Sequence, residues 1–226
     1  MTILALVFDV DGTLAETEEC HRTCFNQAFA EHGLEWTWDR SLYTRLLAVT
    51  GGRERIVHYA RSRGQDIDAA SLHARKTELY NERVRKGAVT LRPGVMNLID
   101  RARREGLLLA IGTTTSRRSV TALLETTLGP EAGRIFASIR TGEDVRRKKP
   151  DPEVYRLVLS DLALDGRCCL CIEDSRNGLV AARAAGMHTV VTPSLYTCHE
   201  DFSDADLVIG DLSMPWSAPE FRPLTS

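Results

Sequence analysis

The sequence predicts an α/β fold in which a doubly wound, parallel, Rossmann-like sheet carries an inserted α-helical cap domain. Two observations support the sheet: continuous apolar runs of strand length recur along the chain, and segments with helical periodicity separate them. This alternation is typical of parallel sheets with helices on both faces. A third observation supports the cap, because the long segment between the first apolar run and Leu91 contains helical patterns and no strand-like run.

The predicted strands are short and apolar, as expected for strands buried on both faces. They span residues 3–8, 107–112, 135–139, 169–172, 189–191 and 207–209. Helical patterns fill the intervals at residues 95–104, 117–127, 152–162 and 177–185. Pro93 and Gly94 precede the first of these helices, and Gly106 and Gly186 follow two of them, which are ordinary start and stop signals.

The helical insertion divides the chain into two predicted domains. Residues 1–16 and 90–226 form the Rossmann-like core, and residues 17–89 form the helical cap. The cap begins with a long helix at about 17–32, and several shorter helices follow it. The tail from Met214 contains Pro215, Pro219 and Pro223, and we expect it to be irregular.

Composition narrows the functional class. The 226 residues include 29 Lys and Arg against 31 Asp and Glu, a net charge of −2, which gives no electrostatic case for a nucleic-acid or membrane partner. No apolar run approaches the ~18 residues needed to span a bilayer. No secretory signal precedes the first strand, so we expect a cytoplasmic protein, monomeric, with its six cysteines reduced.

Polar side chains follow the predicted strands, at the edge of the sheet where parallel strands end. Asp9 and Asp11 follow the first strand, Thr113 the second, and Glu173 and Asp174 the fourth. Lys149 follows the weak third strand and its loop. Crowded carboxylates repel one another unless a cation lies among them, and Mg²⁺ prefers oxygen ligands and accepts phosphate oxygens. The residues therefore predict phosphoryl transfer with Mg²⁺ as cofactor.

These motifs resemble the haloacid dehalogenase superfamily of phosphohydrolases, and the resemblance covers nearly the whole chain. Its motifs are Asp9-Val10-Asp11-Gly12-Thr13, Thr113, Lys149-Pro150 and Glu173-Asp174-Ser175, in that order. The resemblance implies that Asp9 is a nucleophile that forms an aspartyl-phosphate and that Asp11 is the general acid and base. Asp11 would need a raised pKa to act as an acid at neutral pH.

The resemblance also implies roles for the remaining motif residues. Thr113 and the N–H of Thr114 would hold phosphoryl oxygens, and Lys149 would neutralise the nucleophile. The metal ligands would be Asp9, the backbone carbonyl of Asp11, and Asp174, with Glu173 as a ligand or helper. Simpler interpretations are a turn at the two aspartates, a solvated basic run at Lys149, and a helix N-cap at residues 173–175. We favour Lys149 over Lys148 because Lys149 directly precedes Pro150.

Several cap and loop residues are candidates for substrate binding. Glu18 and His21 share a helix face just after the catalytic loop, as does Arg22. A glycine turn that opens a helix suits an anion. The remaining candidates are Thr50, Gly51, Gly52 and Arg53 in that turn, Arg75 and Lys76 on a later helix, and Thr114, Thr115 and Ser116 after the second strand. A plain interhelical turn and a solvated helix face are the alternatives.

Longer stretches are similar to one branch of the superfamily, the CbbY-like phosphatases. They are residues 8–18, 50–56, 113–116 and 196–200. This resemblance implies a phosphorylated-sugar substrate, xylulose-1,5-bisphosphate, whose removal protects Rubisco from an inhibitor in the Calvin cycle. Arg53 stands where the pattern has Lys, and Cys198 where it has Arg, so the identity of the sugar stays open.

Two other functions remain open at this point. A β-phosphoglucomutase-like phosphosugar mutase would share the fold, the cap and both aspartates, and the motifs do not separate it from a phosphatase. A phospho-accepting signalling module would also gather acids, a Thr and a Lys, but such modules need only ~120 residues and no helical insertion.

Overall fold

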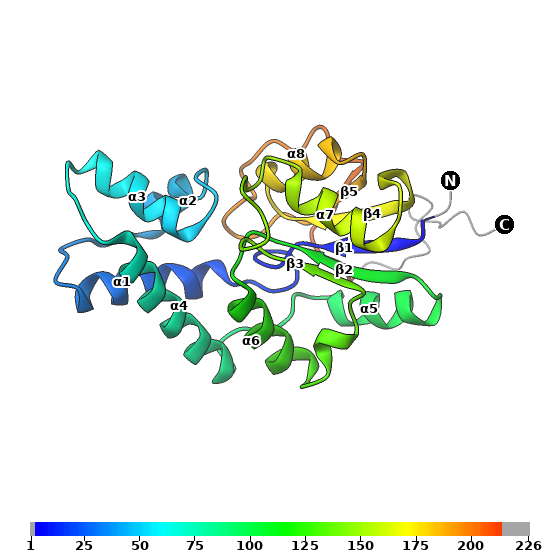
Figure 1. Ribbon diagram of the computed structural model, residues 1–226, viewed down its shortest axis with the longest axis horizontal. Helices are drawn as coiled ribbons and strands as arrows, with labels where there is room; N and C mark the ends of the chain where they lie inside the picture. Colours follow the sequence, from blue (N-terminus) through cyan, green and yellow to red (C-terminus); the bar gives the residue numbers. More distant parts are fainter. Residues whose placement is uncertain (1–2, 214–226) are drawn as a thin grey trace.

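The computed structural model of the protein describes residues 3–213. Within this range one parallel sheet runs in the order β3-β2-β1-β4-β5-β6, as the sequence predicts (Figure 1). The order reverses on either side of β1, which places β1 at the centre. The strands are β1 (Ala5–Phe8), β2 (Leu108–Gly112), β3 (Ser138–Arg140), β4 (Cys169–Glu173), β5 (His188–Val191) and β6 (Leu207–Val208).

Alternate side chains of the central strand pack into two separate cores. Leu6 and Phe8 point into the core formed with α5 (Val95–Arg104) and α6 (Arg117–Leu128). Ala5 and Val7 point into the core formed with α7 (Glu153–Leu162) and α8 (Arg176–Ala184). The centre of the sheet is therefore buried on both faces, which is why β1 is wholly apolar.

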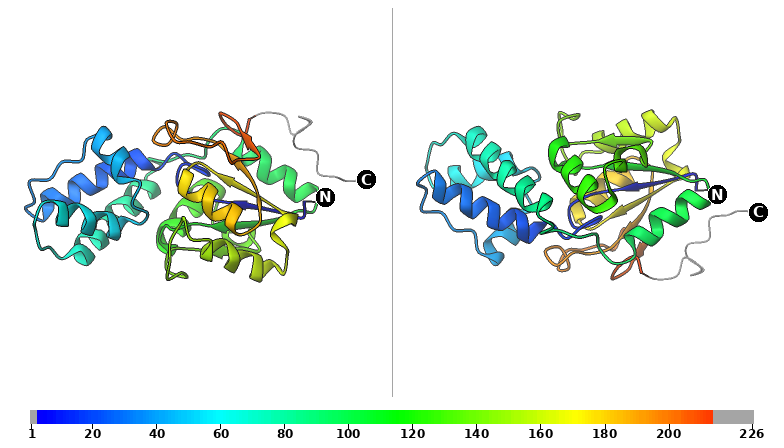
Figure 2. Two further views of the ribbon diagram at one scale, coloured as in Figure 1. Left: turned by 90° about the horizontal axis from the view of Figure 1, so that it is seen from above. Right: turned by 90° about the horizontal axis from the view of Figure 1, so that it is seen from below.

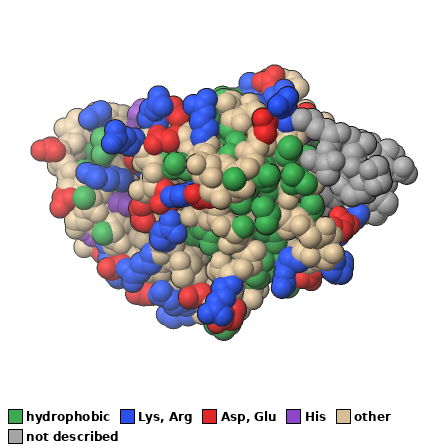
Figure 3. Space-filling view, turned by 45° about the vertical axis from the view of Figure 1, so that its right-hand side comes forward, with side chains coloured by type: hydrophobic (Ala, Val, Ile, Leu, Met, Phe, Trp, Pro, Cys, Tyr) green, Lys and Arg blue, Asp and Glu red, His purple; other side chains and the backbone are tan. Residues whose placement is uncertain are grey.

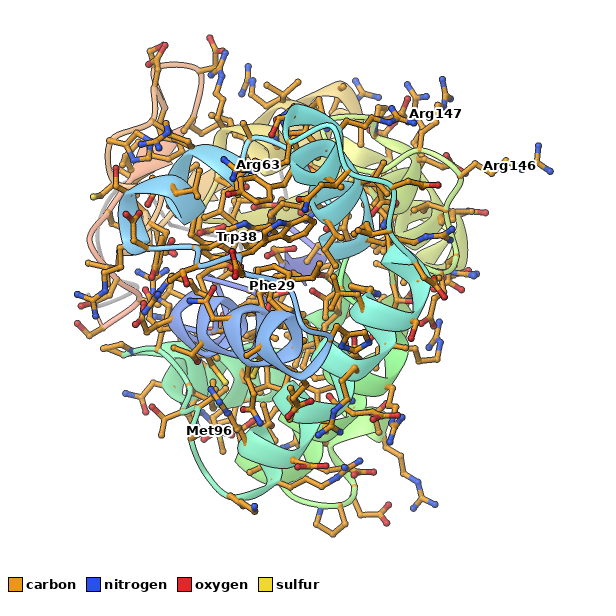
Figure 4. The ribbon with its side chains drawn as sticks, turned by 90° about the vertical axis from the view of Figure 1, so that its left-hand side faces the viewer. Phe29, Trp38, Arg63, Met96, Arg146 and Arg147 are labelled. Carbon is orange, nitrogen blue, oxygen red and sulfur yellow. The ribbon has the colours of Figure 1, made fainter. Side chains whose placement is uncertain are left out.

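Four helices form the cap beyond the carboxyl ends of the strands (Figures 1 and 2). They are α1 (Glu18–Glu31), α2 (Arg40–Leu46), α3 (Gly52–Ser62) and α4 (Ala69–Arg85), all within residues 17–89. An aromatic cluster joins them. Phe29 and Trp38 meet edge to face at 4.7 Å between ring centroids, and Figure 4 shows both between α1 and the shorter helices.

The two chain segments that connect cap and core run side by side. Ala15 and Leu91 form an antiparallel bridge, and the N–H of Arg92 donates to the carbonyl of Leu14 at 2.9 Å. The buried guanidinium of Arg92 donates to the carbonyls of Gly12 and Thr192 and lies 3.3 Å from a carboxylate oxygen of Glu16. Arg92 thus fixes the base of the cap against the loops that carry the site.

The start of the third strand differs from the sequence-based expectation. The third strand begins at Ser138 and not at residue 135, because a 3₁₀ turn (Ala132–Arg134) precedes it. Cys168 belongs to a 3₁₀ turn, whereas Cys169 and Cys171 are buried in β4 as small apolar side chains.

The tail from Met214 lies outside the described residues. The cap limits 17–89 remain a prediction.

The opposite end of the sheet faces away from the cap. Large apolar side chains are exposed there, among them Leu4 and Leu108, and Figure 3 shows apolar side chains gathered on this side. Among residues 3–213, no helix is both long and apolar enough to cross a membrane.

Alanine substitutions at Gly94 and Gly106 test how closely the chain packs around Gly94. Both have positive φ, but a Cβ at Gly94 would lie 1.9 Å from the carbonyl carbon of Leu212, whereas a Cβ at Gly106 would meet nothing within 4 Å. We expect Gly106→Ala to lower the free energy of unfolding by about 1 kcal/mol and Gly94→Ala by at least about 2 kcal/mol more. Urea denaturation followed by circular dichroism measures both values, and equal losses would contradict the packing at Gly94.

Candidate active site

A buried ammonium group joins two strand ends at the centre of the sheet. Asp9 directly follows β1, and its N–H donates to the carbonyl of Ile172 in β4 at 3.0 Å. Nζ of Lys149 donates to Oδ1 of Asp9 at 2.6 Å and to Oε1 of Glu173 at 2.7 Å. The structure therefore brings Lys149 to the acids, whereas the neighbouring Arg146 and Arg147 point outward (Figure 4).

Three carboxylates crowd around this contact. Oxygen atoms of Asp9, Glu173 and Asp174 all lie within 4.8 Å of one another, and all three residues are buried. Burial raises the pKa of Asp9 to about 7, with Lys149 opposing the shift and Glu173 adding to it. Burial and the charges of Glu173 and Asp9 raise the pKa of Asp174 well above its usual value. One ammonium does not balance three acids, and a divalent cation fits this oxygen-only group.

Gly12 allows the two acidic loops to approach closely. A Cβ at this position, where φ is +79°, would lie 2.1 Å from Oδ2 of Asp174. Thr197 holds Asp174 from the other side, because its hydroxyl donates to the Asp174 carbonyl oxygen at 2.7 Å. The position of Asp174 is therefore set by the loop after β1 and by the loop after β5.

Asp11 points away from the acidic cluster and toward the cap. Its carboxylate accepts hydrogen bonds from Thr17 at 2.5 Å, from Nε2 of His21 at 3.0 Å, and from the hydroxyl of Thr115. Burial alone would raise the pKa of Asp11, but His21 and the two hydroxyls hold it well below its usual range. The expected upward shift is therefore wrong for the site without substrate, because three donors stabilise the anion.

A hydrogen-bonded chain connects Asp11 to helix α4. Nζ of Lys76 lies 2.6 Å from Nδ1 of His21, and the His21 ring stacks on Tyr80 with centroids 3.9 Å apart. The ammonium can only donate, so Nδ1 accepts and Nε2–H is left to donate to Asp11. Burial and the charge of Lys76 lower the pKa of His21, which favours this neutral form.

The loop after β2 supplies hydroxyl groups. Thr113 is 1% exposed, and its Oγ1 accepts from the N–H of Thr115 at 3.3 Å. The hydroxyl of Ser116 accepts from the N–H of Ser119 and caps the N-terminus of α6, so Ser116 has a structural role.

A cavity of about 210 Å³ lies between the core loops and the cap. Most of the residues proposed from the sequence line it: Asp9, Asp11, Glu18, His21, Thr50, Gly51, Gly52, Lys76, Thr113, Thr114, Thr115, Ser116, Lys149 and Asp174. Glu173 lies beneath this surface and is fully buried, where it accepts hydrogen bonds from Lys149 and Tyr155.

Three cationic candidates lie elsewhere. Arg53 is exposed on the outer side of α3. Arg75 pairs with Glu31 at 2.7 Å and with Glu78 at 3.1 Å on the surface. Arg22 pairs with Glu19. Side chains of successive helical residues point about 100° apart. Arg53 directly follows the cavity residue Gly52, and Arg75 directly precedes the cavity residue Lys76. The side chains of Arg53 and Arg75 therefore turn away from the cavity.

The cavity also contains residues that the sequence analysis missed. Arg55 is buried, with Nη1 donating to the hydroxyl of Tyr43 at 3.1 Å, and that hydroxyl donates to Glu18 at 2.6 Å. His73 lies one turn before Lys76 on the same helix face, and this spacing was the available signal. Lys148 comes from a core loop and Asn177 from the first turn of α8, and nothing in their sequence positions indicated contact with the cap.

Contacts across the cavity hold the cap against the core. Nζ of Lys148 donates to the carboxylate of Glu54 in α3 at 2.7 Å. Nδ2 of Asn177 donates to the hydroxyl of Thr50 at 3.1 Å, and the hydroxyl of Tyr196 donates to Glu19. The cap is closed over the acids in this structure.

Comparison with known proteins agrees with this geometry. Residues 6–192 match the family described as haloacid dehalogenase-like hydrolase. The chain is 51% identical to Protein CbbY of Rhodobacter capsulatus, over 94% of this chain and 95% of that protein. It is 42% identical to a CBBY-like protein of Arabidopsis thaliana, over 96% of this chain and 71% of that protein.

A solved structure shares the whole arrangement. CbbY from Rhodobacter sphaeroides, crystallised in complex with xylulose-1,5-bisphosphate, superposes with a TM-score of 0.90 at 44% identity, over 93% of this chain and 95% of that one. The fold, the closed cap over a buried acidic site, and these similarities lead to one conclusion. The chain belongs to the haloacid dehalogenase-like hydrolases and is a sugar-phosphate phosphatase of the CbbY type.

Proposed function

We propose that this protein removes one phosphate from xylulose-1,5-bisphosphate, with Mg²⁺ as cofactor and an aspartyl-phosphate at Asp9 as intermediate. The contact of 2.6 Å between Lys149 and Asp9, at the floor of the cavity, carries the proposal. This contact keeps the Asp9 carboxylate beside the Lys149 ammonium, at the place where a phosphate group would enter. The similar CbbY complex with this bisphosphate supports the choice of substrate.

The first step forms the intermediate. A carboxylate oxygen of Asp9 attacks phosphorus, and the bond from phosphorus to the sugar oxygen breaks. Lys149 offsets charge on the Asp9 carboxylate, and the hydroxyl of Thr113 and the N–H of Thr114 hold phosphoryl oxygens. The leaving oxygen takes a proton from Asp11, and the chain from Lys76 through His21 ends on that carboxyl group.

The second step returns the protein to its starting state. Asp11 is the anion in the free site, so it takes up a proton from solvent when the phosphorylated substrate binds. The first step leaves Asp11 as the anion again, and it then accepts a proton from water, which returns to solvent as the product leaves. The water oxygen bonds to phosphorus, the bond between phosphorus and Asp9 breaks, and inorganic phosphate leaves. The same carboxyl group thus serves as acid and then as base.

Mg²⁺ would be held by the carboxylates of Asp9 and Asp174 and by the backbone carbonyl of Asp11. When bound, it supplies positive charge against the acids and the incoming phosphate. Glu173 is better placed as a helper than as a ligand. Its two oxygens accept hydrogen bonds from Lys149, Tyr155 and the N–H of Asp174.

The opposite wall of the cavity suits a second anionic group. Arg55, His73, Lys76 and Lys148 line the same cavity as Asp9. A bisphosphate can place one phosphate at Asp9 and the other among these groups. We also propose that the protein is a monomer. Its six cysteines are free thiols, as expected for a reducing compartment such as the cytoplasm.

The test is a phosphate-release assay over a panel of phosphorylated sugars with Mg²⁺ present. We expect the highest kcat/KM with xylulose-1,5-bisphosphate and lower values with the corresponding monophosphates. Conversion of β-glucose-1-phosphate to the 6-phosphate without phosphate release would support the mutase instead.

Asp9→Asn keeps the size of the side chain but removes the nucleophile. We expect phosphate release to fall by at least about 1,000-fold because no aspartyl-phosphate can form. Circular dichroism should show an unchanged fold. Retention of more than a hundredth of the activity in the purified variant would refute the role of Asp9.

Removal of divalent cations with EDTA should abolish turnover, and Mg²⁺ should restore it. A second readout is independent of turnover: Mg²⁺ should raise the melting temperature of the unmodified protein, because it binds the crowded acids of the folded state. Asp174→Ala should lose this increase. An equal increase in both proteins would argue against Asp174 as a ligand.

A further inference from the structure

His73 lines the cavity but takes no part in the two chemical steps described above. It lies in the second turn of α4 and lines the cavity at the cap wall. A Cβ built on Gly52 would lie 2.7 Å from its Nε2, so the ring packs directly against the first residue of α3. Among the described residues, no side chain forms a hydrogen bond with the imidazole, which leaves its nitrogens available to a ligand.

Charged groups face His73 from every side. Lys76 lies one turn further along α4, and His21 lies on α1. Glu54 comes from α3 and Lys148 from the core loop before Pro150, where these two form an ion pair at 2.7 Å. Burial first, and then the charges of Lys76 and Lys148, lower the pKa of His73 to about 4. The ring is therefore neutral at pH 7 while the cavity holds no anion.

We propose that His73 recognises the second phosphate of a bisphosphorylated sugar and takes up a proton from solvent when that phosphate binds. This inference rests on the proposed function. The proton moves from water onto the free ring nitrogen, which then donates to a phosphate oxygen. It returns to water when the product leaves, so no other reactant is required.

The charges around His73 determine whether phosphate binding favours or disfavours its protonation. Two nearby ammonium groups disfavour a third cation at His73, and a phosphate dianion placed among them removes this penalty. A monophosphorylated sugar bound at Asp9 brings no such charge to the cap wall, so His73 stays neutral. The residue therefore favours bisphosphates over monophosphates, and it does so more strongly at lower pH.

The pH dependence can be stated for binding. The pKa of His73 is about 4 in the free protein and higher in the bisphosphate complex. The contribution of the imidazolium to affinity is complete below the free value. It is lost as the pH rises through the value in the complex. The phosphate has its own ionisation near pH 6, so the effect must be measured as a difference between variants.

Calorimetry tests the proton uptake directly. Asp9→Asn binds substrate without turnover, and the matched protein is Asp9→Asn combined with His73→Gln. Titration in two buffers of different ionisation enthalpy gives the protons taken up per ligand bound. With xylulose-1,5-bisphosphate at pH 6.5, we expect the His73-containing protein to bind as many as about one more proton than the His73→Gln variant. With xylulose 5-phosphate the two proteins should agree. Equal uptake with the bisphosphate would overturn the proposal.

Kinetics provides the second test, in proteins that retain Asp9. We expect His73→Gln to lower kcat/KM for xylulose-1,5-bisphosphate by about 10- to 100-fold, mostly through KM, and for xylulose 5-phosphate by less than about 3-fold. His58→Gln is the control, because His58 is exposed on the outer side of α3. Equal losses with both sugars would show a merely structural role and refute the proposal.

The two proposals fail in different ways. If the unmodified protein releases no phosphate from xylulose-1,5-bisphosphate, the proposed function is wrong. If it releases phosphate but His73→Gln does not change the preference for bisphosphate, the function stands and the role of His73 is wrong.

Discussion

The Lys149 ammonium is the interaction on which the site depends. It is 5% exposed and lies between two carboxylates that belong to neighbouring strands of one parallel sheet. Removing a charge from water is costly, and the nearby charges of Asp9 and Glu173 offset that cost by keeping the pKa of Lys149 above its usual value. The same contact fixes the Asp9 carboxylate. One ammonium group therefore joins the core loops through two ion pairs and positions Asp9, the proposed nucleophile.

The core and the cap supply different parts of the site. The proposed nucleophile Asp9 and the neighbouring acids lie at the ends of strands, where backbone hydrogen bonds fix their positions. The partners of Asp11 come largely from the cap: Thr17 just before α1, His21 on α1, and Lys76 behind it on α4. The cap therefore supplies donors around Asp11, and in the proposed mechanism the same residues shield the acid–base group from water.

The sequence was sufficient for the sheet and for the residues at its edge. Apolar runs bounded by polar residues determine where strands end, and parallel strands necessarily bring Asp9, Thr113 and Asp174 to one edge. The cap was harder to predict. Whether Arg53 or Arg55 faces the cavity depends on how α3 is rotated, and Tyr59 of α3 packs against Trp36 and Trp38 of the cap. The lowered pKa of Asp11 also depended on partners up to 104 residues away.

The paired connections at Ala15 and Leu91 have a consequence for how this protein can change. The chain leaves the sheet and returns to it at one point, and Arg92 seals that point with hydrogen bonds to backbone carbonyls. Because the two ends of the inserted cap lie side by side, changes in the cap helices do not pull the core strands apart. The cap helices can therefore change while the register of the strands stays the same. Cap residues away from Asp11 can therefore differ in descendants of this chain, whereas exchange of His21 or Lys76 would also remove partners of Asp11.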